Sequence, residues 1–187
     1  YEAYQEWRKG PGSPESLTAA GKAVPQNWFR HCGEAKDGSQ LFLLQGARYE
    51  DSVDDEQYVL AIANLMDKVT SPTDDRRLTV LLDVRPEEGW PNVPATSMLP
   101  MMKHAMDVLP GNYPERLRRV VVYPMPWLVT GLWTVVSSML DPVTRDKFVV
   151  MSGSCDIGSD CPPELGEYVS LKQLPEDAHR MHAALAE

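Results

Sequence analysis

Residues 78 to 84 read LTVLLDV, and this stretch decides the class of fold that we expect for the chain. Apolar side chains fill it almost without a break, whereas a strand with one face in water alternates apolar and polar residues. A short continuous run of this kind, rich in leucine and valine, is typical of a parallel strand with both faces covered. The stretch therefore predicts a buried strand in an α/β sheet.

The sequence that follows repeats the alternation of helix and strand. Residues 119 to 123 (RVVVY) and 147 to 151 (KFVVM) have the composition of further strands. Between these strands we expect one helix that Thr96 caps, with Pro100 in its first turn, and a second helix over residues 127 to 140. Two consecutive β-α-β units imply parallel strands joined by right-handed crossovers, with helices on at least one face. The pattern does not give the order of the strands.

The first third of the chain gives a weaker signal. Residues 1 to 38 show little periodicity and contain the breaker cluster GPGSP at positions 10 to 14, which predicts an extended N-terminal arm. The main domain is then expected over residues 39 to 187, beginning with a strand at Leu41–Leu44. A helix is predicted after Asp54, because acidic groups favour a helix N-terminus. Its apolar face is expected to consist of Val59, Ile62, Met66 and Val69.

Three motifs within residues 113 to 151 carry a resemblance to a known family. They are YPERL at 113 to 117, MPW at 125 to 127 and LDPVTRDK at 140 to 147. In order and separation they resemble the core signature of the CRAL-TRIO family, which includes phosphatidylinositol and phosphatidylcholine transfer proteins and tocopherol transfer protein. The resemblance implies a mostly parallel sheet as the floor of an apolar pocket, helices that cover the sheet, and a gate helix over the pocket. It also implies that one lipid is bound there for transfer, presentation or sensing, in a chain without the N-terminal helical domain of the transfer proteins.

The resemblance also assigns roles to two groups of residues. In the family, the helix that matches residues 127 to 140 swings to admit or release lipid at a membrane. Its pocket or gate residues would be Trp127, Leu128, Leu132, Val135 and Met139. The positions that match contacts to an inositol phosphate headgroup, or an ion pair linked to the gate, are Glu115, Thr144 and Lys147. A hydroxyl and an ammonium can donate hydrogen bonds to a phosphate, and a carboxylate can hold that ammonium when phosphate is absent. Two plainer interpretations stay open: the helix residues as ordinary core, and Glu115 with Lys147 as a surface ion pair worth under about 1 kcal/mol.

A second function also stays open beside binding of a phospholipid or another hydrophobic ligand. The loop at residues 85 to 91 (RPEEGWP) and the segment at 176 to 187 (EDAHRMHAALAE) depart from the family pattern. With the missing helical domain and the acidic charge, these departures are what a degenerate member would show. Such a member would act as a protein interaction scaffold or as a subunit of a larger assembly. An apolar cavity under residues 127 to 140 would favour the lipid, and a packed interior would favour the scaffold.

Composition limits the partners and the location. The formal net charge of -9 argues against nucleic acid, because neutralising phosphates requires clustered Lys and Arg. The same charge restricts membrane contact to a transient or local one. No apolar run approaches the ~18 residues of a membrane-spanning helix. We therefore expect an intracellular protein, cytoplasmic or organellar, that is soluble or peripherally bound to a membrane. The chain begins at Tyr1 rather than at a methionine, so a fragment or a processed product is among the expectations.

No arrangement of residues predicts catalysis. Residues 152 to 155 (SGSC) follow a strand but lack the flanking glycines of a nucleophile elbow. His179 and His182 are one helical turn apart and have no evident third metal ligand nearby. An odd number of cysteines favours a reducing compartment, although Cys155 and Cys161 could pair across a turn-rich loop. We expect no enzymatic activity, no metal and no cofactor other than a bound lipid.

Overall fold

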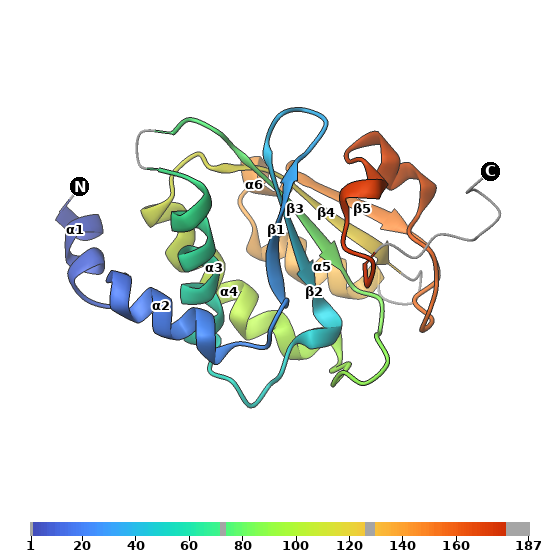
Figure 1. Ribbon diagram of the computed structural model, residues 1–187, viewed down its shortest axis with the longest axis horizontal. Coiled ribbons are helices and arrows are strands. Elements are labelled where there is room, and N and C mark those ends of the chain that lie inside the picture. The colour runs from blue at the N-terminus through green and yellow to red at the C-terminus, as the bar shows by residue number, and fades with distance from the viewer. Residues whose placement is uncertain (1, 72–73, 126–129, 179–187) are drawn as a thin grey trace.

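The computed structural model describes residues 2–71, 74–125 and 130–178. These residues form an α/β fold around a five-stranded sheet with the order β1-β2-β3-β4-β5 (Figure 1). β1 runs antiparallel to β2, and the neighbouring pairs from β2 to β5 are parallel. The predicted class, a mostly parallel sheet with helices, is confirmed. The strands are β1 Phe29–Glu34, β2 Gln40–Gln45, β3 Leu78–Asp83, β4 Leu117–Met125 and β5 Phe148–Ser152.

Each parallel strand coincides with a stretch that the sequence predicts as a strand. The predictions over residues 41 to 44, 78 to 84, 119 to 123 and 147 to 151 correspond to β2, β3, β4 and β5. The strand order follows the chain order, so every crossover returns to the neighbouring strand. Right-handed crossovers of this kind place all their helices on the same side of the sheet, which we call the helix face.

Three helices make these crossovers. α3 Asp55–Val69 lies between β2 and β3, α4 Leu99–Asn112 between β3 and β4, and α5 Thr130–Met139 between β4 and β5. The start of α3 agrees with the prediction, because the carboxylate of Asp54 accepts the backbone N–H of Glu56 at 2.9 Å. The helix expected after Thr96 begins later, at α4. Residues Ala95–Met98 form a 3-10 turn first, a common arrangement at helix N-termini, and Pro100 lies in the first turn of α4 as expected.

Residues 1 to 38 are not an extended arm, and the sequence prediction is corrected here. They form α1 Glu2–Lys9, α2 Pro14–Ala23 and the edge strand β1. The GPGSP cluster separates the two helices, and its Ser13 caps α2 by accepting the N–H of Ser16 at 3.3 Å. α2 then packs on α3 through four buried residues: Leu17, Ala20, Leu60 and Ala63. The strand escaped prediction because β1, as an edge strand with the sequence FRHCGE, has no continuous apolar run.

The strand register aligns apolar side chains in two rows across the helix face, which we call the two apolar rows. The first row consists of the register partners Phe42, Val80, Val120 and Phe148. The second row lies two residues further along each strand and consists of Leu44, Leu82, Val122 and Val150. Side chains two residues apart point to the same side of a sheet. At the β2 end both rows join a buried cluster with residues of α3 and α4, including Tyr58, Ile62, Met66 and Met101.

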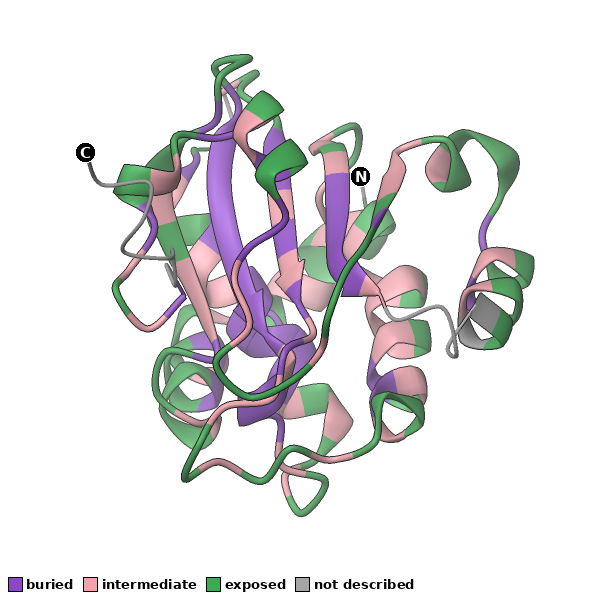
Figure 2. Ribbon diagram, turned by 90° about the vertical axis from the view of Figure 1, so that its right-hand side faces the viewer, coloured by how far each residue is buried: buried purple, intermediate pink, exposed green. Residues whose placement is uncertain are grey.

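The opposite face of the sheet is covered by the C-terminal residues 161–178, which we call the strap (Figure 1, red). The strap contains two 3-10 turns, Pro163–Glu167 and Leu171–Gln173. Its buried members are Cys161, Leu165, Val169, Leu174 and Ala178. They pack on the sheet residues that alternate with the two apolar rows, namely Leu41, Leu43, Leu81, Val121, Tyr123 and Met151. Figure 2 shows the resulting buried strands at the centre of the molecule, with exposed segments in the surrounding loops.

Candidate functional site

The two apolar rows are covered unevenly from one end to the other. Phe42, at the β2 end, is fully buried under α3 and α4. At the β5 end, Phe148 is half-buried, and Val150 keeps 37% of its surface exposed. On the helix face, apolar side chains that reach solvent form a surface against which an apolar ligand can pack. We call the two apolar rows the floor.

α5 lies over this exposed end and contacts it with one side of the helix. The ring centroids of Trp133 and Phe148 are 5.4 Å apart, with the ring planes inclined by 41°. Val136 is buried, and so is Leu140, which directly follows the helix. Positions three, four and seven residues apart share one side of a helix, so Trp133, Val136 and Leu140 form its inner side.

The outer side of α5 exposes two large apolar residues, Val135 and Met139, beside the hydroxyl residues Thr134 and Ser138. Val135 and Met139 keep 43% and 45% of their surface exposed. Val135 follows Trp133 by two residues, which is about 200° around a helix, so the two side chains point in nearly opposite directions. The predicted gate residues Val135 and Met139 therefore lie away from the floor in this structure. Trp127 and Leu128 lie outside the described residues, as does the side chain of Leu132.

The sequence analysis did not predict which residues form the inner side of α5, although the sequence contains a pattern that fits them. Trp133, Val136 and Leu140 have the i, i+3, i+7 spacing of an apolar helix stripe. The parallel stripe through Val135 and Met139 has the same type of spacing. When two stripes compete, the sequence does not say which one faces the sheet.

Glu115 lies at the amino-terminal end of the floor strands, in the turn that leads into β4. Its backbone is left-handed, with φ of 57°, and its side chain is exposed. It lines a hollow of about 650 Å³ between the C-terminal ends of α3 and α4. The charged members of the lining are Asp67, Asp74, Asp75, Arg77, Glu115 and Arg116. The lining of the hollow thus carries charges of both signs.

Thr144 and Lys147 are brought together on the turn that leads into β5. α6 Pro142–Arg145 begins here, because the carboxylate of Asp141 accepts the N–H of Thr144 at 3.0 Å. Hydrogen bonds from the hydroxyl and from the backbone N–H of Thr144 lower the pKa of Asp141. The N–H of Lys147 then donates to the carbonyl of Thr144 at 3.0 Å. Glu115 and Lys147 make no ion pair in the described part of the chain, so the predicted trio is only partly assembled.

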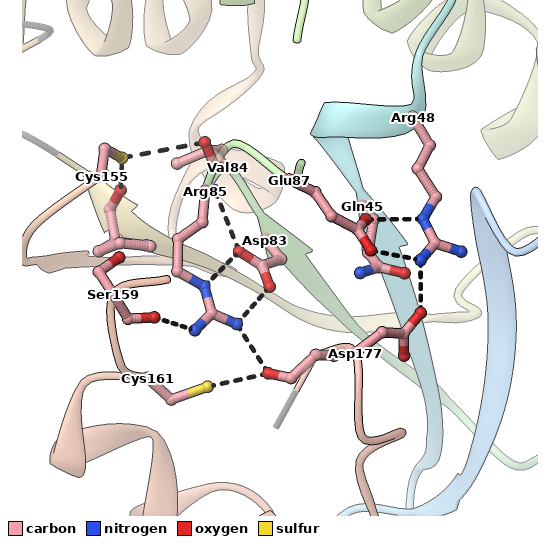
Figure 3. Close-up of polar contacts among 12 residues, drawn as sticks. Gln45, Arg48, Asp83, Val84, Arg85, Glu87, Cys155, Ser159, Cys161 and Asp177 are labelled. Carbon is pink, nitrogen blue, oxygen red and sulfur yellow. Dashed lines mark hydrogen bonds and ion pairs between the residues drawn. The ribbon is translucent and has the colours of Figure 1, made fainter. Parts of the chain in front are cut away.

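A buried ion pair lies at the carboxyl end of β3. Asp83 ends the strand, and its two oxygens accept from Nε and Nη2 of Arg85 at 2.9 and 2.6 Å (Figure 3). Arg85 also donates to the carbonyls of Ser159 and Ala178, both at 2.7 Å. One guanidinium therefore joins β3, the loop after β5 and the end of the strap. The sequence motifs do not predict the hydrogen bonds of Arg85 to Ser159 and Ala178, because these residues are far from Arg85 in the chain.

A second set of ion pairs holds the strap from its other side. The guanidinium of Arg48 donates to both oxygens of Glu87, at 2.9 and 2.8 Å, and to Asp177 at 2.5 Å (Figure 3). Arg30 donates to both oxygens of Asp177, at 2.9 and 2.8 Å. Burial alone would raise the pKa of Asp177, but Arg30 and Arg48 outweigh it and hold the pKa below its ordinary value.

The cysteines do not form a disulfide. The thiol of Cys155 donates to the carbonyl of Pro124 at 2.9 Å, and that of Cys161 donates to the carbonyl of Ala178 at 3.3 Å. Burial, together with the charge of Asp83, raises the pKa of Cys155 to about 11. This thiol is protonated at neutral pH and is therefore a hydrogen-bond donor rather than a nucleophile.

Other candidate chemistry is not assembled in the part of the chain that the structure describes. The hydroxyl of Ser154 donates to Asp156 at 2.6 Å, within its own loop. Residues 2–71, 74–125 and 130–178 contain no group of His, Cys, Asp and Glu that could hold a metal ion. They also include no helix with the length and apolar character needed to cross a membrane. His179 and His182 lie outside the described residues.

Comparisons with known proteins agree with this geometry. A model of the CRAL/TRIO domain matches residues 31–178. The CRAL-TRIO domain-containing protein T23G5.2 of Caenorhabditis elegans is 35% identical over 71 residues, which cover 38% of this chain and 10% of that protein. Protein real-time of Drosophila pseudoobscura pseudoobscura is 30% identical over 73 residues, which cover 39% of this chain and 10% of that protein. The aligned part thus spans about a tenth of the length of these curated relatives. The crystal structure of Sfh5 covers 78% of this chain and 55% of its own, with a TM-score of 0.58 and 20% identity, which indicates the same fold.

Proposed function

The chain belongs to the CRAL-TRIO domain family, whose members bind lipids or other hydrophobic ligands, and we propose that it holds a single lipid against the two apolar rows, under α5. The observation that carries this proposal is the uneven cover of the rows. They are sealed at Phe42 but accessible at Val150, and α5 exposes the large apolar side chains of Val135 and Met139 on its outer side. A helix that only completes a core does not need large apolar side chains on its solvent side.

The energetics favour a ligand with a long hydrocarbon chain. Burial of apolar surface contributes about 0.8 kcal/mol for each methylene group removed from water. A single acyl chain therefore supplies ample affinity, even after the loss of freedom on binding is subtracted. This role is one of binding and carriage rather than catalysis.

We further propose that the ligand is a phospholipid of the phosphatidylinositol type, held at its phosphate by Thr144 and Lys147. A backbone hydrogen bond joins the two residues across the turn before β5. This strand starts at Phe148, a member of the first apolar row. A hydroxyl and an ammonium at the edge of an apolar floor can donate to a phosphate while the chains lie on the floor. Glu115 is the candidate acceptor for Lys147 when no phosphate is bound, which requires the two side chains to approach each other.

Native mass spectrometry of the purified protein, with extraction of any bound lipid, tests the floor. Val150→Glu places a charge on the accessible end of the second apolar row, and we expect it to abolish lipid binding. Ile157→Glu is the matched control, because Ile157 is also an exposed apolar residue but lies in the loop after β5. Equal binding by both variants would contradict the placement of the lipid.

The headgroup assignment is tested by Lys147→Ala, with Lys22→Ala on the exposed surface of α2 as its control. We expect the Lys147 variant to lose phosphatidylinositol relative to phosphatidylcholine after incubation with vesicles that contain both lipids. A wild-type protein that takes up neither lipid would overturn the carrier function. That outcome would favour the scaffold instead, with the exposed side of α5 as a protein contact rather than a site of transient membrane contact.

A further inference from the structure

Trp133 lies against the β5 end of the first apolar row. Its ring lies 5.4 Å from that of Phe148, the last member of the first apolar row. Val150, two residues further along β5, remains 37% exposed. The indole therefore covers one end of the floor while the neighbouring position stays accessible.

We propose that Trp133 is the specificity-determining residue of the site: its indole is an internal substitute for the ligand chain, and a lipid must displace it from Phe148 in order to bind. This inference rests on the proposed function. It deepens that function by setting a lower limit on the length of the acyl chain.

The magnitudes define this limit. Each methylene that leaves water strengthens binding about fourfold. An aromatic pair contributes about two- to tenfold beyond the area that it buries, and the indole also loses its own burial when it moves. The cost of displacing a large aromatic side chain is then offset by about four to six methylenes. Shorter chains leave Trp133 in place, and longer chains displace it.

The structure lets the indole leave at modest cost. Trp133 is only half-buried, and the outer side of α5 is already in contact with solvent at Val135 and Met139. A reorientation of the Trp133 side chain alone exposes only the buried half of its ring, whereas a shift of the whole helix also uncovers Val136 and Leu140. The opposite side of the sheet differs, because the strap is held there by Arg48 and Arg85.

Phosphatidylcholines with acyl chains from about four to about sixteen carbons test the inference by titration, because they share one headgroup. Trp133→Ala removes the competitor, so we expect tighter binding at every chain length and at least about a tenfold gain for the shortest chain that binds. Trp133→Phe keeps a ring against Phe148, so the shortest acyl chain that it binds should be close to that of the wild type. A tryptophan that merely supported the fold or touched the ligand would show the opposite sign, with weaker binding in the Ala variant.

Tryptophan fluorescence gives a second readout. The difference between the wild-type and Trp133→Phe emission spectra isolates Trp133 from the other tryptophans of the chain. We expect this difference spectrum to shift when a long-chain phosphatidylcholine binds and to stay unchanged with a short-chain one. Lipid binding with no spectral shift, or weaker binding by Trp133→Ala, overturns the role of Trp133 and leaves the proposed function intact. Failure of every lipid to bind overturns both.

Discussion

The two faces of the sheet are closed in different ways. On the strap face, buried side chains from Cys161 to Ala178 cover the strands, and three arginines fix the end of the strap. On the helix face, the β5 end is covered by α5 through Trp133, Val136 and Leu140, and apolar surface remains exposed beside them. One face is thus sealed by packing and ion pairs together, whereas the contacts of α5 with the β5 end of the other face are apolar packing contacts.

The difference shows where this fold can take up a ligand. A ligand can replace the segment that covers one face only if moving that segment costs little free energy. The burial of the ligand must offset this cost. The strap cannot move without breaking the hydrogen bond of Arg85 to the Ala178 carbonyl and the ion pairs of Asp177 with Arg30 and Arg48. α5 leaves no buried charge behind, and this is why we place the lipid under α5 and not under the strap.

Breaking the Arg85 contact should have the largest effect on the sealed face. Arg85→Ala leaves the buried carboxylate of Asp83 without its partner, and removing one member of a buried pair costs about 3 to 5 kcal/mol. Urea unfolding should therefore show a large loss of stability. Arg145→Ala, at an exposed position in α6, should change stability by less than about 0.5 kcal/mol. Similar curves for the two variants would show that the strap is not held by Arg85.

A matched pair of truncations compares the packing of the two faces. Leu165→Ala removes a fully buried strap side chain and should cost about 2 to 5 kcal/mol. Met139→Ala truncates an exposed side chain on the outer side of α5 and should cost less than about 1 kcal/mol. Thermal or urea unfolding measures both. A large loss of stability for Met139→Ala would mean that the outer side of α5 is packed in solution, which would contradict the difference between the two faces.

The smallest effect concerns acid. The pKa of Asp177 is depressed in the folded state, so its stabilisation is complete above the ordinary aspartate pKa of about 3.9 and is lost as pH falls through the lower folded value. We expect wild type to lose about 1 kcal/mol of stability below about pH 4 that Asp177→Asn does not lose. Hydrogen exchange of the strap amides at pH 7 and pH 3 is the measurement. The same pH dependence in both proteins would assign the acid effect to another carboxylate.

Most of the sheet could be predicted from sequence because its strands are local signals. LTVLLDV and the two VV-containing stretches carry the composition of buried parallel strands within a few residues, whatever their neighbours are. β1 and the strap carry no such signal. β1 has one neighbour in the sheet and the polar sequence FRHCGE, and the strap is ordered by contacts to residues far away in the chain.

The candidate site was predicted only in part, for a related reason. The motifs identified the family and placed Thr144 beside Lys147, because both lie on one turn. Which side of α5 faces the floor depends on the rotation of the helix about its axis. The contact between Trp133 of α5 and Phe148 of β5 fixes this rotation, and the two residues are far apart in the local sequence pattern. The hydrogen bond of Arg85 to the Ala178 carbonyl and the ion pair of Arg30 with Asp177 join residues far apart in the chain, so no local sequence pattern predicts them.

The sequential strand order has a consequence for how the chain can fold during synthesis. Because β2, β3, β4 and β5 pair in the order in which they emerge from a ribosome, each new strand can add to an edge that is already formed. The strap is the exception, since Asp177 must reach back to Arg30 near the start of the sheet. Its face of the sheet therefore stays uncovered until late in synthesis, and this exposed apolar surface is where a chaperone would find the nascent chain.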